Sequence, residues 1–286
     1  MKKLLFILIL FYSVQLVGQE TTYVYNTFNS TRVINSHSTE MIEKKGLDFR
    51  VGHRFGDIAG DNGGAQSMFG IDNSADISVG FEYGITNSLN IGINRYKGAG
   101  PYRQLFEGYA KYKFLAQSNK MPISLVGIAK FNVTGMEAST DSTSPVSFKD
   151  FVDRTSSSYQ LIIARKFSER FSMQIVPTYV HRNYVGFYDE NATFAIGAGV
   201  KLQVTKMIGI IGEYHYVMFG SETQEKLGLQ HPVALGVEFD TGGHTFQLNF
   251  TNSRGFGEAQ YIPSTTSNIA DGQFRFGFTI SRVFKL

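Results

Sequence analysis

The amino-acid sequence predicts an all-β protein, a transmembrane antiparallel β-barrel of about twelve strands with long extracellular loops and short periplasmic turns. Three observations lead to this prediction. Segment after segment alternates apolar and polar residues with a period of two, which is the pattern of a strand with one apolar face. The connections between these segments are alternately long and short. The chain also begins with a stretch that is typical of exported proteins.

Residues 1–18 are predicted to be a secretory signal peptide. Lys2 and Lys3 precede an apolar run from Leu4 to Tyr12, and the small residue Gly18 stands near the expected cleavage site. The apolar run is shorter than the roughly 20 residues that a membrane-spanning helix needs. We therefore expect cleavage rather than an uncleaved anchor.

The composition excludes several classes of protein. With 42% hydrophobic and 14% aromatic residues, the chain is too apolar to be disordered. It contains no Cys, which excludes disulfides, thiolate nucleophiles and Cys-ligated metals. The net charge is only +3 and the basic residues are scattered, so we expect no nucleic-acid partner.

Eight segments show clear alternation. In one of them Ile77, Val79 and Phe81 alternate with Ser78 and Glu82. In chain order the eight segments are 47–55, 76–84, 89–95, 105–114, 192–204, 232–240, 244–253 and 273–281. Their lengths suit strands that cross a bilayer at a tilt, which takes roughly 9 to 11 residues. No segment shows the 3.6-residue periodicity of a helix.

Four noisier segments, 123–132, 157–167, 171–182 and 208–217, complete the count of about twelve strands. The third contains Pro177, which cannot donate a hydrogen bond to a neighbouring strand. The fourth puts Ile211 on the same side as Glu213 and His215.

The lengths of the connections favour a membrane barrel over a soluble sandwich. Tight turns such as "SER", "TKM" and "TGG" alternate with long loops, of which 56–75, 133–156 and 253–271 are the clearest. Bacterial outer-membrane barrels have short periplasmic turns and long surface loops. An even number of strands, with both ends in the periplasm, places every short turn on the inner side of the membrane.

This topology assigns the two faces of each strand. In 244–253, Phe246 and Leu248 are predicted to face lipid, whereas Gln247 and Asn249 face the lumen. Tyr residues near many strand ends are predicted to lie at the membrane interfaces. The same rule predicts a set of charged residues that face the lumen: Asp48, Arg50, Arg54, Asp76, Glu82, Glu107, Lys111, Lys113, Lys201, Glu213, Glu238 and Arg275.

These charges leave two alternatives open. Residues of opposite sign can pair across the lumen and close it, or they can line a narrow polar channel and set its selectivity. The N-terminal segment 19–46 is polar and fits no lipid-facing strand. We expect it to hang in the periplasm or to plug the lumen, with an additional hairpin as the alternative, and we expect the barrel to occupy 47–286.

The sequence predicts no catalytic residue, metal site or cofactor. The glycine-rich stretches "GAGP" and "GDNGG" lack the strand-then-helix context of a phosphate-binding loop. The acidic stretch 57–76 lacks the spacing of an EF-hand, and the His residues form no metal motif. A Ser nucleophile paired with His181, His215 or His244 is the enzymatic alternative, but the sequence does not bring such residues together.

Two resemblances concern membrane insertion and family. The C-terminal "FRFGFTISRVFKL" resembles the signal that ends outer-membrane barrels and is recognised by their insertion machinery. Nearly the whole mature chain, including "LDFRVGHRFG", "FGIDNSADISVGFEYGIT", "PTYVHRN" and "FDTGGHTFQLNFTNS", resembles an uncharacterised β-barrel family of Bacteroidetes. The resemblance implies a single-domain barrel in the outer membrane of such a bacterium, and it implies no activity.

The sequence thus predicts a channel or passive transporter for small polar or ionic solutes in the bacterial outer membrane. Its partners would be the lipid bilayer, the insertion machinery and those solutes. The first alternative is a closed structural or binding barrel that acts through its surface loops 133–156 and 253–271. A membrane-embedded hydrolase is the second alternative.

Overall fold

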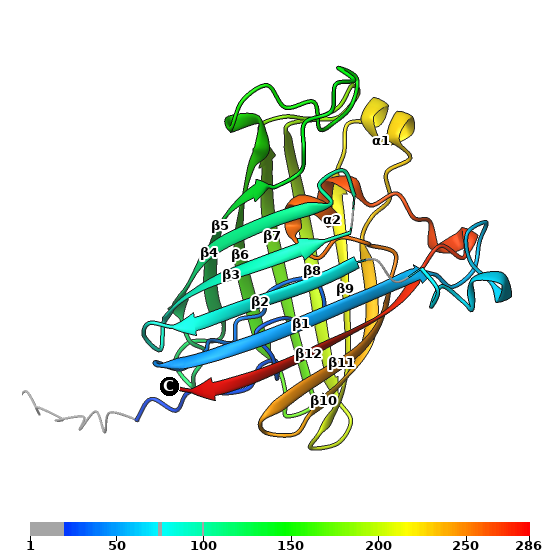
Figure 1. Ribbon diagram of the computed structural model, residues 1–286. Helices are drawn as coiled ribbons and strands as arrows, with labels where there is room; N and C mark the ends of the chain where they lie inside the picture. Colours follow the sequence, from blue (N-terminus) through cyan, green and yellow to red (C-terminus); the bar gives the residue numbers. More distant parts are fainter. Residues whose placement is uncertain (1–19, 74–75, 99) are drawn as a thin grey trace, which may run out of the picture.

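The computed structural model describes residues 20–73, 76–98 and 100–286. The predicted signal peptide lies outside the described residues. Within them the chain forms one closed antiparallel barrel of twelve strands, in which each strand pairs with its neighbours in sequence and β1 pairs with β12 (Figure 1). The predicted fold class and strand number are therefore confirmed.

The strands follow the segments predicted from alternation. They are β1 (Gly46–Asp57), β2 (Asp76–Gly84), β3 (Leu89–Lys97), β4 (Gln104–Leu115), β5 (Ser124–Thr134), β6 (Thr155–Lys166), β7 (Phe171–Arg182), β8 (Ala192–Gln203), β9 (Ile208–Met218), β10 (Val233–Asp240), β11 (His244–Thr251) and β12 (Arg275–Lys285). The strands are strongly tilted, and the short turns and the C-terminus lie at the same end of the barrel (Figure 1).

Burial alternates along most of each strand because one face points into the ring and the other points away from it. In β2 the residues of even number are buried, whereas Ile77 and Phe81 on the other face are exposed. Large apolar side chains are exposed on this outer face around the whole ring, for example Ile93, Phe131, Tyr159, Phe194 and Leu235. Such a continuous apolar surface is stable only against lipid.

In β5, β6 and β7 the alternation of apolar and polar residues is less regular, because some residues on the inner face are apolar as well. Val126, Ile128, Ile162 and Val176 are buried together with Tyr109 inside the ring, so β5, β6 and β7 are apolar on both faces there. The pairing of β6 with β7 is interrupted opposite Pro177, which has no N–H to donate.

Within the described residues, two short α-helices lie in the extracellular loops, where the sequence predicted none. Helix α1 (Ser221–Leu227) connects β9 to β10, and α2 (Glu258–Ser264) lies between β11 and β12. Each helix has seven residues, which is two turns and too few to show a periodic pattern. In the part of the chain that the structure describes, no helix has the length and apolar character needed to cross a membrane.

Candidate functional site

Most of the charged residues predicted for the lumen are buried on the inner face of the ring. Eleven of the twelve are buried, and only Lys113 is partly exposed, near the periplasmic end of β4 where the register with β5 shifts. The buried ones are Asp48, Arg50, Arg54, Asp76, Glu82, Glu107, Lys111, Lys201, Glu213, Glu238 and Arg275. Burial of so many charges requires partners, because an unpaired charge away from water is costly.

The N-terminal segment supplies many of these partners. Residues 27–42, called the inner segment below, are almost entirely buried and run behind β1 to β4 in Figure 1, in dark blue. The inner segment receives hydrogen bonds from Arg50 Nη2 of β1 (2.7 Å), Lys111 Nζ of β4 (2.5 Å) and Gln174 Nε2 of β7 (2.8 Å). Gln247 Nε2 of β11 also donates to it, at 2.8 Å. Contacts with strands on all sides of the ring mean that this segment lies within the lumen.

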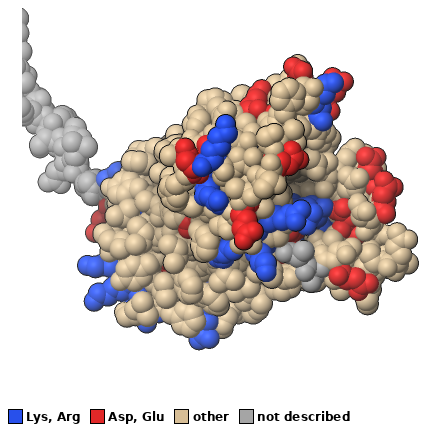
Figure 2. Space-filling view, turned by 45° about the horizontal axis from the view of Figure 1, so that its top comes forward, with Lys and Arg blue, Asp and Glu red and all other residues tan. Residues whose placement is uncertain are grey.

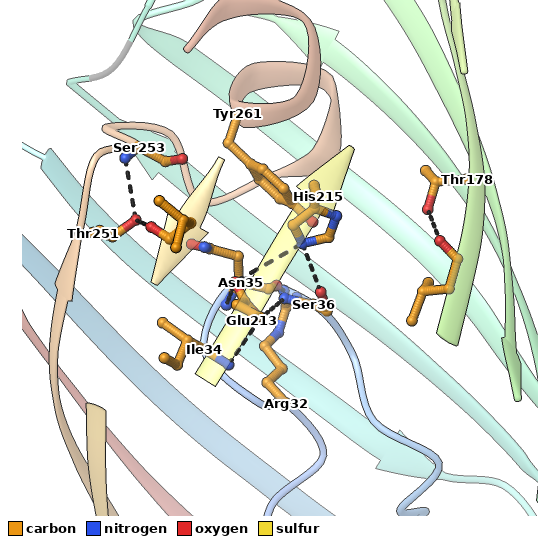
Figure 3. Close-up of polar contacts among 12 residues, drawn as sticks. Arg32, Ile34, Asn35, Ser36, Thr178, Glu213, His215, Thr251, Ser253 and Tyr261 are labelled. Carbon is orange, nitrogen blue, oxygen red and sulfur yellow. Dashed lines mark hydrogen bonds and ion pairs between the residues drawn. The ribbon is translucent and has the colours of Figure 1, made fainter. Parts of the chain in front are cut away.

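The tip of the inner segment is a tight turn held by β9. The Glu213 carboxylate accepts hydrogen bonds from the backbone N–H groups of Ile34, Asn35 and Ser36, at 3.3, 2.8 and 3.1 Å (Figure 3). Ser36 Oγ lies 3.0 Å from His215 Nε2. Three backbone donors on one carboxylate form a strong, charge-assisted contact, so the turn is tied firmly to the wall.

A second segment enters the lumen from the extracellular end. The loop from Ser253 to Asp271 was predicted to be a surface loop, but Glu258, Tyr261 and Ile262 of α2 are fully buried, and the prediction is wrong for this part. The Tyr261 ring points at His215 and meets it edge to face, with centroids 5.1 Å apart (Figure 3). The apolar pair Tyr261 and Ile262 within a loop of a membrane barrel was the available signal for this burial.

Ionic contacts join α2, the wall and the inner segment. Lys130 of β5 pairs with Glu258 of α2 and, at 3.5 Å, with Glu107 of β4. Glu107 also accepts a hydrogen bond from Tyr96, at 2.8 Å, and lies 4.0 Å from the Arg32 guanidinium. These five side chains are buried. Arg32 of the inner segment and Glu258 of α2 therefore belong to the same network of buried charges as Glu107 and Lys130 of the wall.

Arg54 makes a second connection between the two inserted segments. Its guanidinium donates to the backbone carbonyls of Ser253, at 3.1 Å, and Gly255 in the extracellular loop. It also donates to Asn35 of the inner segment and lies over the Phe256 ring, 4.1 Å from its centroid. The predicted lumen residue Arg54 is thus a bridge between the segments rather than an open wall residue.

Among the described residues, the inner segment and α2 fill the middle of the lumen, whereas wider pockets lie at both mouths. Between Arg32, Arg50 and Phe256 the free volume is about 10 Å³, which is about the space of one water molecule. At the periplasmic mouth, a pocket of about 510 Å³ is lined by Lys201, Asn29 and the short turns. At the extracellular mouth, pockets of about 370 and 680 Å³ meet at Arg254. The inserted segments separate these spaces.

The Ser36 and His215 pair lacks the geometry of a hydrolase. The Glu213 carboxylate lies 4.0 Å from Nε2, the same ring nitrogen that contacts Ser36. A catalytic triad needs the acid on the other nitrogen, Nδ1. Ser36, His215 and Glu213 are also buried, so the site has no access for a substrate. Among the described residues, no group of three His, Asp or Glu side chains is arranged to hold a metal ion.

The fold is similar to that of two solved porins. The chain aligns with a structure described as "NanC porin structure in rhombohedral crystal form" at a TM-score of 0.51 and 9% identity, covering 84% of this chain and 100% of that one. It aligns with the "KdgM porin" at a TM-score of 0.50 and 8% identity, covering 84% and 99%. At such low identity the similarity concerns the fold alone. No curated protein matches the sequence.

This closed barrel of twelve antiparallel strands with an apolar outer band has the architecture of bacterial outer-membrane proteins, and the protein is located in that membrane. The sequence matches a family described as "Membrane bound beta barrel domain (DUF5777)" over residues 28–284. The match includes the inner segment and the twelve strands, except Thr27 at the start of the inner segment and Lys285 at the end of β12. Because it extends over nearly the whole chain, the protein belongs to this family of membrane bound β-barrel domains.

Proposed function

We propose that the protein is a channel or passive transporter for small polar or ionic solutes, closed in this conformation by the inner segment and α2. One observation carries the proposal: the middle of the lumen is filled by segments that are not part of the barrel wall. Wide polar pockets lie at both mouths. Among the described residues, the inner segment and the loop that contains α2 lie between these pockets, together with wall side chains such as Tyr109, Ile128 and Ile162. A barrel built to stay closed could instead fill its lumen with wall side chains alone.

The contacts that hold these segments support a preference for polar solutes. The inner segment is held largely by hydrogen bonds from wall side chains such as Gln174, Gln247 and Arg50. If the segment moves away, these side chains lose their partners and are left to line a water-filled passage. Carboxylates such as Glu213 and Glu238 share the wall with Lys111 and Lys201, so a passage would be lined by charges of both signs.

A porin-like fold and the absence of access to the Ser36 and His215 pair support a non-enzymatic role. We also propose that the outer-membrane insertion machinery recognises the C-terminal residues, which form β12 and close the barrel against β1. A source in the Bacteroidetes stays a prediction that rests on the resemblance described above.

The test is conductance in planar lipid bilayers, measured with salt gradients on the mature chain and on a variant that lacks residues 22–44. The intact protein should give no current or rare brief openings, whereas the deletion should give frequent ohmic steps with ion selectivity. Folding of both is checked by the heat-dependent mobility of barrels on gels. A folded deletion variant that stays silent would refute the inner segment as the closing element and favour a closed barrel that acts through its loops.

A further inference from the structure

A polar and an apolar pocket adjoin each other at the extracellular mouth. The polar pocket has a volume of about 370 Å³ and the apolar pocket about 430 Å³. Gly100, Ser264 and Thr266 line both of them, so the two pockets share an edge. Figure 2 shows this side of the molecule, with Lys and Arg side chains gathered near its middle. Together the pockets could accommodate one molecule with two chemically different ends.

The polar pocket contains positively charged side chains, and hydrogen bonds hold two of its lining residues, Arg254 and Gln260, in place. Arg254 is half-exposed and pairs with Asp76 at 3.0 Å, and this hydrogen bond raises the pKa of Arg254 further. Arg103 is exposed, and its guanidinium makes no hydrogen bond or ion pair with any other described residue. Gln260 is held in place because its side chain donates to the Tyr102 carbonyl at 2.8 Å. Asp76 neutralises Arg254. The guanidinium of Arg103 is therefore a positive charge in the pocket without a counter-charge among the described residues.

The apolar pocket is built where several long loops meet. Pro101, Pro145, Phe187, Leu227, Leu229 and Pro263 line it. Its size lies in the range of small-molecule sites, which are largely apolar with a few polar groups. Phe187 at its rim exposes 77% of its surface. A bound apolar group would cover this ring.

The loops around the apolar pocket are fixed by hydrogen bonds. The Tyr102 hydroxyl donates to the Tyr184 carbonyl at 2.6 Å, and burial raises the pKa of Tyr102 to about 12, so this donor stays protonated. Arg182 forms a two-pronged ion pair with Asp189, at 2.8 and 2.7 Å. Asp189 therefore has its charge satisfied although it also lines the pocket. A preformed site of this kind binds without a large cost of ordering the loops.

We propose that this double pocket binds small amphipathic anions, with the anionic group at Arg103 and the apolar body against Phe187 and Leu227. A carboxylate on an aromatic or short aliphatic body has the required chemistry. The site lies in the extracellular loops, outside the closed part of the lumen, and binding there does not require conduction. The proposal therefore stands or falls independently of the channel function.

The experiment is calorimetric titration of the full mature protein in lipid nanodiscs with 4-phenylbutyrate, and with its neutral analogue 4-phenylbutanamide. The intact protein should bind the carboxylate saturably and at least fivefold more tightly than the amide. R103Q should weaken carboxylate binding at least fivefold and leave amide binding unchanged. F187S, a change at an exposed residue that should not disturb folding, should weaken the binding of both compounds. K149Q removes a basic residue from a neighbouring loop outside the pocket, and binding should not change.

Three results would overturn the proposal. The first is heat that does not exceed that of empty nanodiscs, because no site would then exist. The second is equal affinity for carboxylate and amide, which would indicate a site for neutral apolar molecules. The third is an equal loss of carboxylate binding in R103Q and K149Q, which would reveal a general attraction to the positive surface rather than a site at Arg103.

Discussion

The backbone N–H of Asn35 donates to the Glu213 carboxylate at 2.8 Å, which joins the tip of the inner segment to the wall of the barrel. The N–H groups of Ile34 and Ser36 share the same carboxylate. Such a contact holds a turn without covalent attachment, and it can be released by neutralising one side chain. It is therefore the most direct place to test whether the inner segment can move.

E213Q should loosen the inner segment. An uncharged amide is a weaker acceptor for three backbone donors, and the loss is about 1–3 kcal/mol. The chain has no Cys, so V33C provides a single thiol inside the lumen. Its reaction with a small methanethiosulfonate should be slow in the V33C protein and roughly tenfold to a hundredfold faster in the V33C/E213Q protein. V33C/E225Q, with its second change on the exposed helix α1, is the matched control and should react as slowly as V33C. Equal rates in all three proteins would contradict the role of Glu213.

K130M should destabilise the folded barrel, and adding E258Q to it should restore most of the lost stability. Removal of Lys130 leaves the buried Glu258 carboxylate without its cation, and such a loss costs about 3–5 kcal/mol. In the K130M/E258Q protein no unpaired carboxylate remains on α2, and Glu107 keeps its hydrogen bonds from Tyr96 and Asn94. Urea unfolding in lipid vesicles should show recovery of most of the lost free energy. A double variant as unstable as K130M would rule out this pairing.

I93R should destabilise the barrel because Ile93 lies at the centre of β3 and is 63% exposed on the outer face. Arg at the bilayer midplane costs about 2–4 kcal/mol in barrels of this kind. The free energy of unfolding in vesicles measures the effect. N62R adds the same charge to an extracellular loop and should change that free energy by less than about 0.5 kcal/mol. Equal effects of the two substitutions would argue against a lipid-facing outer surface.

The inner segment and α2 should act as two barriers in series. Replacement of residues 256–263 by a Gly and Ser linker should raise conductance little on its own, because the inner segment still fills the middle of the lumen. Combined with the deletion of 22–44, it should raise single-channel conductance above that of either variant. A linker in place of residues 221–227 is the control, since α1 contributes only Thr223 to the buried residues. A double variant no more conductive than the deletion alone would mean that α2 is not a barrier.

Much of the architecture could be read from local patterns. The alternation of Phe246 and Leu248 with Gln247 and Asn249 predicted β11 and both of its faces, because side-chain direction in a strand depends only on residue parity. The lengths of the connections predicted which end of the barrel carries the loops. Lys201 and Glu213 were likewise assigned to the inner face by parity, and they are buried there.

The contents of the lumen could not be predicted in the same way. Glu213 and Ile34 are 179 positions apart in the chain, and nothing local to either residue indicates that they meet. Glu258 and Tyr261 lie in the seven-residue helix α2, which is too short for a periodic pattern to mark its buried face.

The sequence by itself determined the barrel, its membrane location and the parity of its charged residues, because these follow from the two-residue repeat of a strand. Only the tertiary structure decided that the inner segment and α2 fill the lumen. It also decided which hydrogen bonds and ion pairs hold these two segments there. The physical reason is that closure of the ring brings distant strands and both inserted segments within hydrogen-bonding distance, and the pairing of buried charges depends on that distance rather than on position in the chain.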